Sequence, residues 1–398
     1  MKSGWDIKKL GEVCELIADG DWIESKDQST CGIRLVQTGN VGVGIFRNKE
    51  GSEHFVSSET FRRLNCTEIF GGDILISRLP DPVGRACVVP DLGQKMITAV
   101  DCSIVRLRRS VCLPTFLVYY ASSAEWFNAI EAKCTGSTRK RISRKNLTDV
   151  LVPIPPLSEQ KRIVAKIDAA FEKIDKLKAN AEKNLANAKE LFQSALDEAM
   201  RPKDGWVEKR LGEVCKTTSG GTPIKSHREY YEDGNIPWLR SGEVCCKDII
   251  KSEMFITELG LRNSSAKIMP KNTVLIAMYG ATAAQAGILR FESATNQAIC
   301  GILPDKYFEP EFLYYYFRTI QRQLAARAQG GAQPNISQEK IKDTLVPILP
   351  LSEQREIVKH LDLLAEKIKI LEQNYTKQIA DCVEMRQAVL REAFEGRL

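Results

Sequence analysis

The amino-acid sequence predicts an α+β protein: two mixed α/β domains separated by two long antiparallel coiled-coil helices, with a pseudo-two-fold internal repeat. Three observations predict this fold. Similar segments recur in the same order in both halves of the 398-residue chain. Each half contains short β-branched runs between turns rich in glycine and proline. Each half then ends in a segment of about 43 residues that has a heptad pattern and lacks proline and glycine.

The repeat is the strongest feature of the sequence. A Gly-Trp pair followed by LGEVC occurs at 4–14 and again at 205–215, and the segment ISRKNLTDVLVPIPPLSEQKRI (142–163) returns from residue 336 as ISQEKIKDTLVPILPLSEQREI. Weaker matches lie between these ends, in the same order: 32–41 with 235–244, 73–77 with 273–277, and 116–120 with 312–316. The ends of the halves match and their middles diverge. The sequence therefore predicts one scaffold that carries two different variable surfaces.

The pattern divides the chain into four parts: a globular domain over 1–153, a helix over 154–200, a second globular domain over 201–347 and a C-terminal helix over 348–398. The apolar runs ILIS and VLIAM are expected to be strands. Aromatic-rich stretches at 114–128 and 310–327 begin with proline, which favours a first helical turn. Each domain is thus predicted to mix strands with helices.

The two long segments have apolar residues at alternating steps of four and three, which is the spacing of a coiled-coil seam. Ser158 is expected to cap the first helix. Both copies place a polar amide at the same step of the seam, where a buried amide can fix the register. The predicted seam residues are Ile163, Ile167, Ile174, Leu177, Asn184 and Leu191 in the first helix, and Ile357, Leu361, Leu364, Ile368, Leu371, Gln378 and Met385 in the second.

A helix of this length with one apolar stripe must bury that stripe, and the other copy is the obvious partner. At about 1.5 Å per residue each helix is on the order of 65 Å long. We expect the pair to run antiparallel and to act as a rigid spacer between two domains.

Composition excludes several classes of protein. No apolar run approaches the length needed to cross a bilayer, and the first residues lack a signal-peptide core, so a cytoplasmic location is expected. The 12 cysteines show no C-x-x-C pair, which predicts free thiols and no metal site. Residues 1–150 hold 21 Lys/Arg against 18 Asp/Glu and residues 200–347 hold 20 against 16, whereas the long helices are close to neutral. A small positive excess on the domains fits a polyanionic partner, although ordinary surface variation explains it as well.

Motifs of self-sufficient enzymes are missing. The sequence has no Walker A segment, no amino-methyltransferase N-P-P-Y or D-P-P-Y segment, and no H-E-x-x-H or G-x-S-x-G signature. The three histidines lie in unrelated contexts. The sequence therefore favours a non-catalytic protein, with no cofactor of its own.

These residues resemble, over the whole chain, the specificity subunit of type I restriction–modification systems. The matching motifs are VPIPPLSEQ (152–160) and VPILPLSEQ (346–354), GGTP (220–223) followed by GNIPW (234–238), GGAQPNIS (330–337) and the ending AFEGRL (393–398). The first domain departs from the pattern, with ADGDW (18–22) in place of GGTP and GSTRKRIS (136–143) in place of GGAQPNIS.

The resemblance implies two target-recognition domains, each reading one half of a bipartite and usually asymmetric DNA site. It implies that the helices set the length of the unread spacer and bind two methyltransferase subunits, to which motor–nuclease subunits are added. S-adenosylmethionine, ATP and Mg are then expected on those partner subunits, and the chain would be a cytoplasmic, DNA-binding, non-catalytic subunit of a DNA adenine methyltransferase and restriction endonuclease complex.

Loops that match in position but differ in chemistry are the expected readers of DNA. Arginine and lysine suit guanine and phosphate, and asparagine and glutamine suit adenine. The candidates are Gln37, Thr38, Arg78, Arg139, Lys140, Arg141, Arg144 and Lys145 in the first domain, and Thr222, Lys225, Ser226, Trp238, Arg240, Tyr279, Gln333 and Asn335 in the second. The basic cluster 139–145 can also be read as a solvated charge run, and Trp238 and Tyr279 as core residues.

Two other interpretations stay open. One is a two-headed coiled-coil adaptor, or a degenerate specificity subunit, that does not read DNA. The other is an enzyme of an unrecognised type, such as a nuclease. The half-site sequences and the spacer length are not predicted by any feature of the chain.

Overall fold

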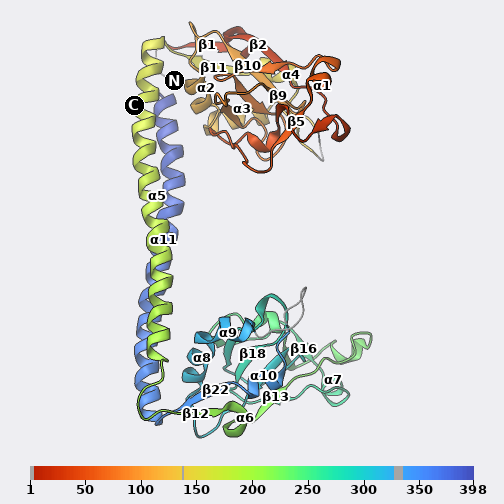
Figure 1. The fold of residues 1–398 in the computed structure, drawn as a ribbon, viewed down its shortest axis with the longest axis vertical. Coiled ribbons are helices and arrows are strands. Elements are labelled where there is room, and N and C mark those ends of the chain that lie inside the picture. The colour runs from red at the N-terminus through yellow and green to blue at the C-terminus, as the bar shows by residue number, and fades with distance from the viewer. Residues whose placement is uncertain (1–3, 137–138, 327–334) are drawn as a thin grey trace. The chain divides into compact units, whose positions relative to one another are not determined.

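A computed structural model describes residues 4–136, 139–326 and 335–398. The chain divides into two compact units: unit 1 contains Met1–Glu182 and Thr376–Leu398, and unit 2 contains Lys183–Tyr375. Each unit holds one globular domain and a part of both long helices, α5 (Leu157–Ala199) and α11 (Leu351–Phe394). The α+β fold class predicted from the sequence is confirmed (Figure 1).

Unit 1 contains a four-stranded sheet in the order β2-β10-β7-β8, a five-stranded sheet in the order β3-β5-β4-β9-β6, and the pair β1-β11. Its strands are β1 (Asp6–Lys9), β2 (Cys14–Asp19), β3 (Gln28–Ser29), β4 (Ile33–Val36), β5 (His54–Val56), β6 (Glu68–Ile69), β7 (Ile74–Ser77), β8 (Ala86–Val88), β9 (Met96–Thr98), β10 (Cys102–Leu107) and β11 (Leu151–Ile154). Its shorter helices are η1 (Leu10–Val13), η2 (Ser25–Asp27), η3 (Thr38–Asn40), α1 (Ser58–Arg63), α2 (Pro114–Tyr120), α3 (Ala124–Glu131) and α4 (Arg144–Thr148).

Unit 2 repeats this topology with sheets in the orders β13-β21-β18-β19-β15 and β16-β14-β20-β17, and the pair β12-β22. Its strands are β12 (Val207–Arg210), β13 (Thr217–Ser219), β14 (Ile236–Leu239), β15 (Asp248–Ile249), β16 (Phe255–Ile256), β17 (Ile268–Met269), β18 (Val274–Ala277), β19 (Ala286–Leu289), β20 (Ser293–Thr295), β21 (Ile299–Ile302) and β22 (Leu345–Ile348). Its shorter helices are α6 (Leu211–Val214), η4 (Arg228–Tyr230), η5 (Ser241–Glu243), α7 (Glu258–Arg262), η6 (Gly280–Thr282), α8 (Pro310–Thr319), α9 (Gln321–Ala326) and α10 (Gln338–Lys342).

Strand register shows that the two domains share one frame. In unit 1, β4 runs parallel to β9 and pairs Val36 with Thr98, and in unit 2, β14 runs parallel to β20 and pairs Leu239 with Thr295. The hairpins β7-β8 and β18-β19 also keep the same register, because Ile76 pairs with Ala86 as Ile276 pairs with Ala286. The sequence alignments that pair residue 37 with 240 and 78 with 278 therefore hold in three dimensions.

Each predicted aromatic helix is in fact two helices. In unit 1 the break comes after α2, where the Ser123 hydroxyl accepts a hydrogen bond from the Trp126 amide at 3.3 Å and so caps α3. A serine that caps a new helix competes with continuation of the old one. In unit 2 the corresponding break separates α8 from α9 at Ile320.

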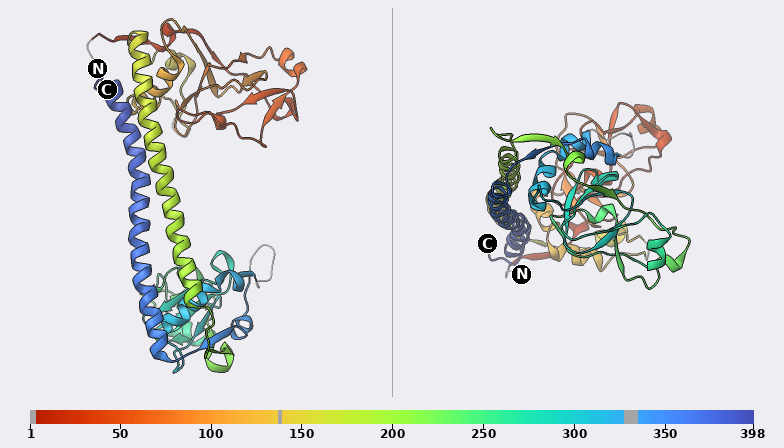
Figure 2. Two further views of the ribbon diagram at one scale, coloured as in Figure 1. Left: turned by 60° about the vertical axis from the view of Figure 1, so that its left-hand side comes forward. Right: turned by 90° about the horizontal axis from the view of Figure 1, so that it is seen from below.

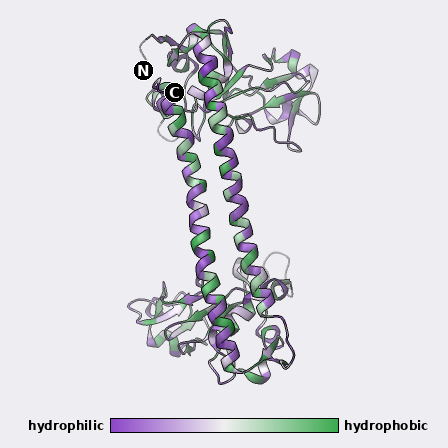
Figure 3. Cartoon of the chain, turned by 90° about the vertical axis from the view of Figure 1, so that its left-hand side faces the viewer, coloured by the Kyte–Doolittle hydropathy of each residue, from purple (hydrophilic) through white to green (hydrophobic). Residues whose placement is uncertain are grey.

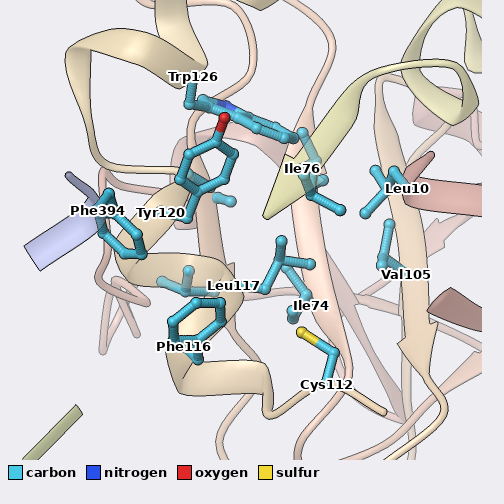
Figure 4. Close-up of a cluster of buried hydrophobic side chains, with 14 of the residues drawn as sticks. Leu10, Ile74, Ile76, Val105, Cys112, Phe116, Leu117, Tyr120, Trp126 and Phe394 are labelled. Carbon is cyan, nitrogen blue, oxygen red and sulfur yellow. The ribbon is translucent and has the colours of Figure 1, made fainter. Parts of the chain in front are cut away.

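The long helices run antiparallel within each unit (Figure 2). In unit 1 Arg386 bonds Asp175 at 2.6 Å, and Arg162 donates to the Leu398 carbonyl oxygen at 2.8 Å. The core of unit 1 extends from the sheets through α2 to these helices. The Phe394 ring packs edge-on against Phe116 at 5.5 Å between ring centroids (Figure 4).

The predicted seam is right at one heptad position and becomes wrong at the other from Leu177 of α5 and Leu371 of α11 onward. Ile163, Ile167, Ile174, Leu361 and Ile368 are buried as expected. The second buried position lies one residue later than predicted. The helices therefore bury Phe171, Leu185, Phe192, Ala365, Ile379 and Leu390 fully or partly, and they expose Leu177, Asn184, Leu191, Leu371, Gln378 and Met385.

A one-residue error of this kind turns a side chain by about 100° around the helix. Ile357 and Leu364 are partly buried at the edge of the core of unit 2. Asn184 and Gln378 are exposed, so the prediction that a buried amide fixes the register of the two helices is wrong. Figure 3 shows apolar and polar residues alternating along both helices.

The starts of the helices also differ from the expectation. Helix α5 begins at Leu157, so Ser158 lies inside the first turn and does not cap it. Gln160 makes the important contact. Its side chain is fully buried, accepts a hydrogen bond from the Leu113 amide, and donates to the carbonyl oxygens of Val111 and Pro155, each at 2.8 Å.

Gln354 does the same at the start of α11. It accepts from the Glu309 amide at 2.9 Å and donates to the carbonyl oxygens of Tyr307 and Leu349. The duplicated LSEQ motif is therefore a buried link that joins each long helix to the loop before α2 or α8. Among the described residues, no helix is apolar enough over a sufficient length to cross a membrane.

Candidate nucleic-acid interface

The basic cluster of unit 1 surrounds the start of α4. The Ser143 hydroxyl caps this helix by accepting from the Asn146 amide at 3.1 Å, which places Arg144 and Lys145 in its exposed first turn. Arg139 is also exposed. These three cations lie on one short surface segment, where they are available to phosphate.

The other two cations of the cluster already have carboxylate partners. Lys140 forms an ion pair with Glu131, and Arg141 lies 3.6 Å from Asp101 and is half-buried. An ion pair that must break reduces the gain from a phosphate contact. Arg139, Arg144 and Lys145 are therefore the stronger candidates.

Turns η3 and η5 occupy equivalent places after β4 and β14. The Gln37 amide donates to Asn40 Oδ1 at 2.9 Å, and the Arg240 amide donates to Glu243 Oε1 at 2.8 Å. The backbone of the turn is thus held in the same way in both domains, while the side chain at its start changes from amide to guanidinium. A constant turn with variable chemistry suits a sequence-reading position.

Arg78 is wrong as a surface contact. Its side chain is 6% exposed and pairs with Asp19 at the end of strand β2. Trp238 is likewise a core residue, because it is 3% exposed and its indole N–H donates to the Gly221 carbonyl oxygen at 2.9 Å. The equivalent Leu35 is buried in unit 1. Both candidate side chains are buried in this structure, so neither is presented as a surface contact for DNA.

A cavity of about 560 Å³ in unit 2 brings together Thr222, Lys225 and Arg240, with Trp238 in its wall. The GGTP motif builds one side of it. A Cβ at Gly220 would lie 2.0 Å from the Thr295 carbonyl oxygen, and one at Gly221 would lie 2.2 Å from Ser265 Oγ. The two glycines therefore let the loop approach β20 closely enough to place Thr222 at the cavity.

The divergent ADGDW segment keeps this approach in unit 1. A Cβ at Gly20 would lie 2.3 Å from the Ala99 carbonyl oxygen, directly after β9. Gly20 thus corresponds to Gly220, and the sequence difference around it changes the surface without changing the frame.

Sequence reasoning missed Asn296 and Gln297, which also line the cavity of unit 2. Thr222 donates a hydrogen bond to Gln297, so the loop and the turn after β20 meet there. Both amides suit adenine recognition. The sequence did contain a signal for them. Strand register makes Asn296 and Gln297 equivalent to Ala99 and Val100 of the first domain, so amides stand in one domain where the other has apolar side chains.

The candidates of unit 2 differ in exposure and in the partners that they already have. Lys225 and Ser226 are exposed in the loop that follows GGTP, while Arg240 is exposed and bonds Glu253 at 2.8 Å. Tyr279 is 38% exposed and pairs through its backbone with Asn335. Gln333 lies outside the described residues.

Two features of the described residues bear on enzyme chemistry: metal-holding clusters and the protonation of buried thiols. Within residues 4–136, 139–326 and 335–398, no group of three His, Cys, Asp or Glu side chains is arranged to hold a metal ion. Burial raises the pKa of the Cys87 and Cys102 thiols to about 12, which keeps these thiols protonated at neutral pH.

Replacing Arg144 and Lys145 together with alanine is expected to weaken DNA binding and to lower its salt dependence. Each lost phosphate contact reduces the slope of log K against log salt by about 0.9. Titrations of a labelled duplex at several salt concentrations measure the slope. Lys173→Ala, on the exposed face of α5 in the same unit, is the control. An unchanged slope in the double variant would mean that these residues are a solvated charge run and do not contact phosphate.

Comparison with known proteins agrees with this architecture. A family model described as "Type I restriction modification DNA specificity domain" matches residues 2–186 and again 203–380. The EcoR124I/EcoR124II specificity subunit of Escherichia coli is 26% identical over 304 residues, which cover 74% of this chain and 71% of that protein. A putative type I restriction enzyme specificity subunit of Methanocaldococcus jannaschii, MjaX, is 22% identical over 92% of this chain and 88% of its own length.

Solved structures share the fold. One chain, from a study of complex assembly and conformational transition in the type I R-M system, aligns with a TM-score of 0.81 and 23% identity, over 100% of this chain and 99% of its own length. The HsdS subunit from Thermoanaerobacter tengcongensis aligns with a TM-score of 0.60 and 22% identity, over 100% and 98%.

Proposed function

The chain belongs to the type I restriction–modification DNA specificity family, and from this premise we propose that it reads a bipartite, asymmetric DNA site. Unit 1 reads one half-site through η3 and the start of α4. Unit 2 reads the other through η5 and the cavity that contains Thr222 and Gln297. The family itself implies recognition of a DNA target; the division of labour between the domains is the proposal.

One observation supports it most. The two domains keep the same strand register and the same backbone support for η3 and η5, and they differ in the side chain at the start of each turn, which is the half-buried Gln37 in one and the exposed Arg240 in the other. Two different surfaces on one frame are what two different half-sites require.

The long helices are proposed to bind two methyltransferase subunits and to fix the spacer between the half-sites. Leu177 and Leu191 of α5 are 54% and 55% exposed, and the equivalent Leu371 and Met385 of α11 are 38% and 45% exposed. Asn184 and Gln378 lie midway, at heptad spacing, so each helix carries an outer column of the type apolar–amide–apolar. Exposed large apolar residues repeated at one helix face favour a helical partner.

The proposal assigns the catalytic steps, methylation and cleavage of DNA, to the partner subunits. The methyltransferase subunits would supply S-adenosylmethionine-dependent adenine methylation, and motor–nuclease subunits would supply ATP- and Mg-dependent cleavage. This chain binds DNA, holds the subunits at the site and sets their spacing.

Reconstitution with the cognate methyltransferase subunit tests the proposal. The expected product is a complex with two methyltransferases per chain that methylates a single bipartite motif, as detected by sequencing of modified adenines in a randomised duplex library. A stable complex without any motif would favour a degenerate adaptor. Methylation or cleavage by the isolated chain would favour an enzyme.

A further inference from the structure

A buried arginine joins two neighbouring surface loops of unit 1. Arg85 lies directly before β8 and is 9% exposed. Its Nε donates to the Val41 carbonyl oxygen at 2.7 Å and its Nη2 to that of Thr38 at 3.1 Å. Its Nη1 donates to the carbonyl oxygens of Leu79 at 2.9 Å and Pro82 at 3.0 Å. One guanidinium thus binds both ends of η3 and both sides of the loop 79–82.

We propose that Arg85 is a positioning residue that fixes η3 and the loop 79–82 as one rigid reading surface, and that it thereby determines the specificity of the first half-site. The inference rests on the proposed function, because it assumes that η3 faces DNA. Arg85 itself makes no base contact; it acts through the two loops that it holds.

The geometry requires a guanidinium. Five N–H donors in a planar fork can serve acceptors on two sides at once, whereas a lysine has three donors on one nitrogen and a glutamine has two on one amide. Burial lowers the pKa of Arg85, which shows that removing this cation from water has a cost. The four carbonyl oxygens offset that cost, so the hydrogen bonds and the buried charge depend on each other.

Among the described residues of the second domain, no arginine occupies the position of Arg85. Strand register places Gln285 at the position of Arg85: the Ala277 amide donates to the Gln285 carbonyl oxygen as the Ser77 amide donates to that of Arg85, each at 2.9 Å. Gln285 is half-buried beside a cavity of about 400 Å³, which is also lined by Cys245 and Cys246 after η5. Within the part of the chain that the structure describes, a hydrogen-bonded buried side chain therefore joins this turn to the hairpin in the first domain and not in the second.

The expected effect is confined to one half-site. In the complex with the methyltransferase subunits, Arg85→Gln should lower discrimination about 5- to 150-fold at one or more base pairs of one half-site, since a displaced reading group loses its preference for the correct base. The other half-site should keep its preference. Methylation of a randomised duplex library, read by sequencing, reports both half-sites in one experiment.

Two further variants separate positioning from charge and from stability. Arg85→Lys keeps the charge and loses the fork, so it should relax the same half-site. Arg106→Gln removes a half-buried arginine of the same domain that bonds Asp73 at 2.7 Å and does not touch either loop. It should lower the melting temperature comparably and leave both half-sites sharp.

The outcomes distinguish this inference from the proposed function. A wild-type complex without any bipartite motif would remove the proposed function itself. A wild-type motif that stays sharp in Arg85→Gln, or that blurs equally in both halves, would overturn the role of Arg85 alone. The role of Arg85 would also be overturned if Arg106→Gln lowered discrimination at the same half-site as strongly as Arg85→Gln.

Discussion

Replacing Gln160 with leucine is expected to destabilise unit 1 by about 3–9 kcal/mol. The substitution leaves the Leu113 amide and the carbonyl oxygens of Val111 and Pro155 without their buried partner, and each unsatisfied group costs roughly 1–3 kcal/mol. Leucine cannot replace any of these bonds. Gln354→Leu is expected to have an equal effect on unit 2, because the same three bonds occur there.

Hydrogen exchange read by mass spectrometry at increasing denaturant measures the two units separately. Protection should fall in residues 4–182 for the first variant and in 183–375 for the second. Gln378→Leu, at an exposed position of α11 in unit 1, is the matched control and should change little. A loss below about 1 kcal/mol for Gln160→Leu would mean that water replaces the side chain and that the link does not hold the helix.

Changing Leu191 and Leu371 together to aspartate should abolish binding of a methyltransferase subunit to unit 2 while the chain stays folded. The two side chains are 55% and 38% exposed, so a carboxylate there remains solvated in the free chain. In a complex it would be desolvated against an apolar surface, which is expected to weaken the affinity by at least about 100-fold.

Analytical ultracentrifugation of the mixed subunits should then show one methyltransferase per chain where the wild type binds two. Ala186→Asp adds a single carboxylate at an exposed position about 200° around α5 from Asn184, and it should leave the stoichiometry unchanged. Full occupancy in the double variant would show that the outer columns are not the docking surface.

The sequence predicted the repeat and the long helices well, because both depend on local periodicity. The phase of the seam was harder. Leu177 and Phe171 belong to two different series of residues that both alternate steps of four and three. Only tertiary packing selects the series of Phe171, whose ring centroid lies 5.6 Å from that of Tyr119. A second apolar column beside the seam therefore led the pattern to the wrong residues.

The candidate site shows the same limit. Aligned turns identified Gln37 and Arg240 correctly as equivalent, since the flanking strands carry strong patterns. Arg78 was a candidate because it occupies a matched position that differs in chemistry between the halves, and Trp238 could be read either as a DNA contact or as a core residue. The burial of both side chains depends on strands distant in sequence. The contacts of Arg85 with four main-chain carbonyls could not be predicted, as no side-chain pattern marks them.

The shared register has a consequence for how such a protein changes. The backbone amides at 37 and 240 donate to the acceptors Asn40 and Glu243 and so hold η3 and η5, whatever side chain these two positions carry. A substitution at 37 or 240 therefore keeps this backbone hydrogen bond, although at 240 it removes the contact of the guanidinium with Glu243. New recognition can accumulate by single steps without passing through unfolded intermediates, and one half can diverge while the other preserves an existing activity.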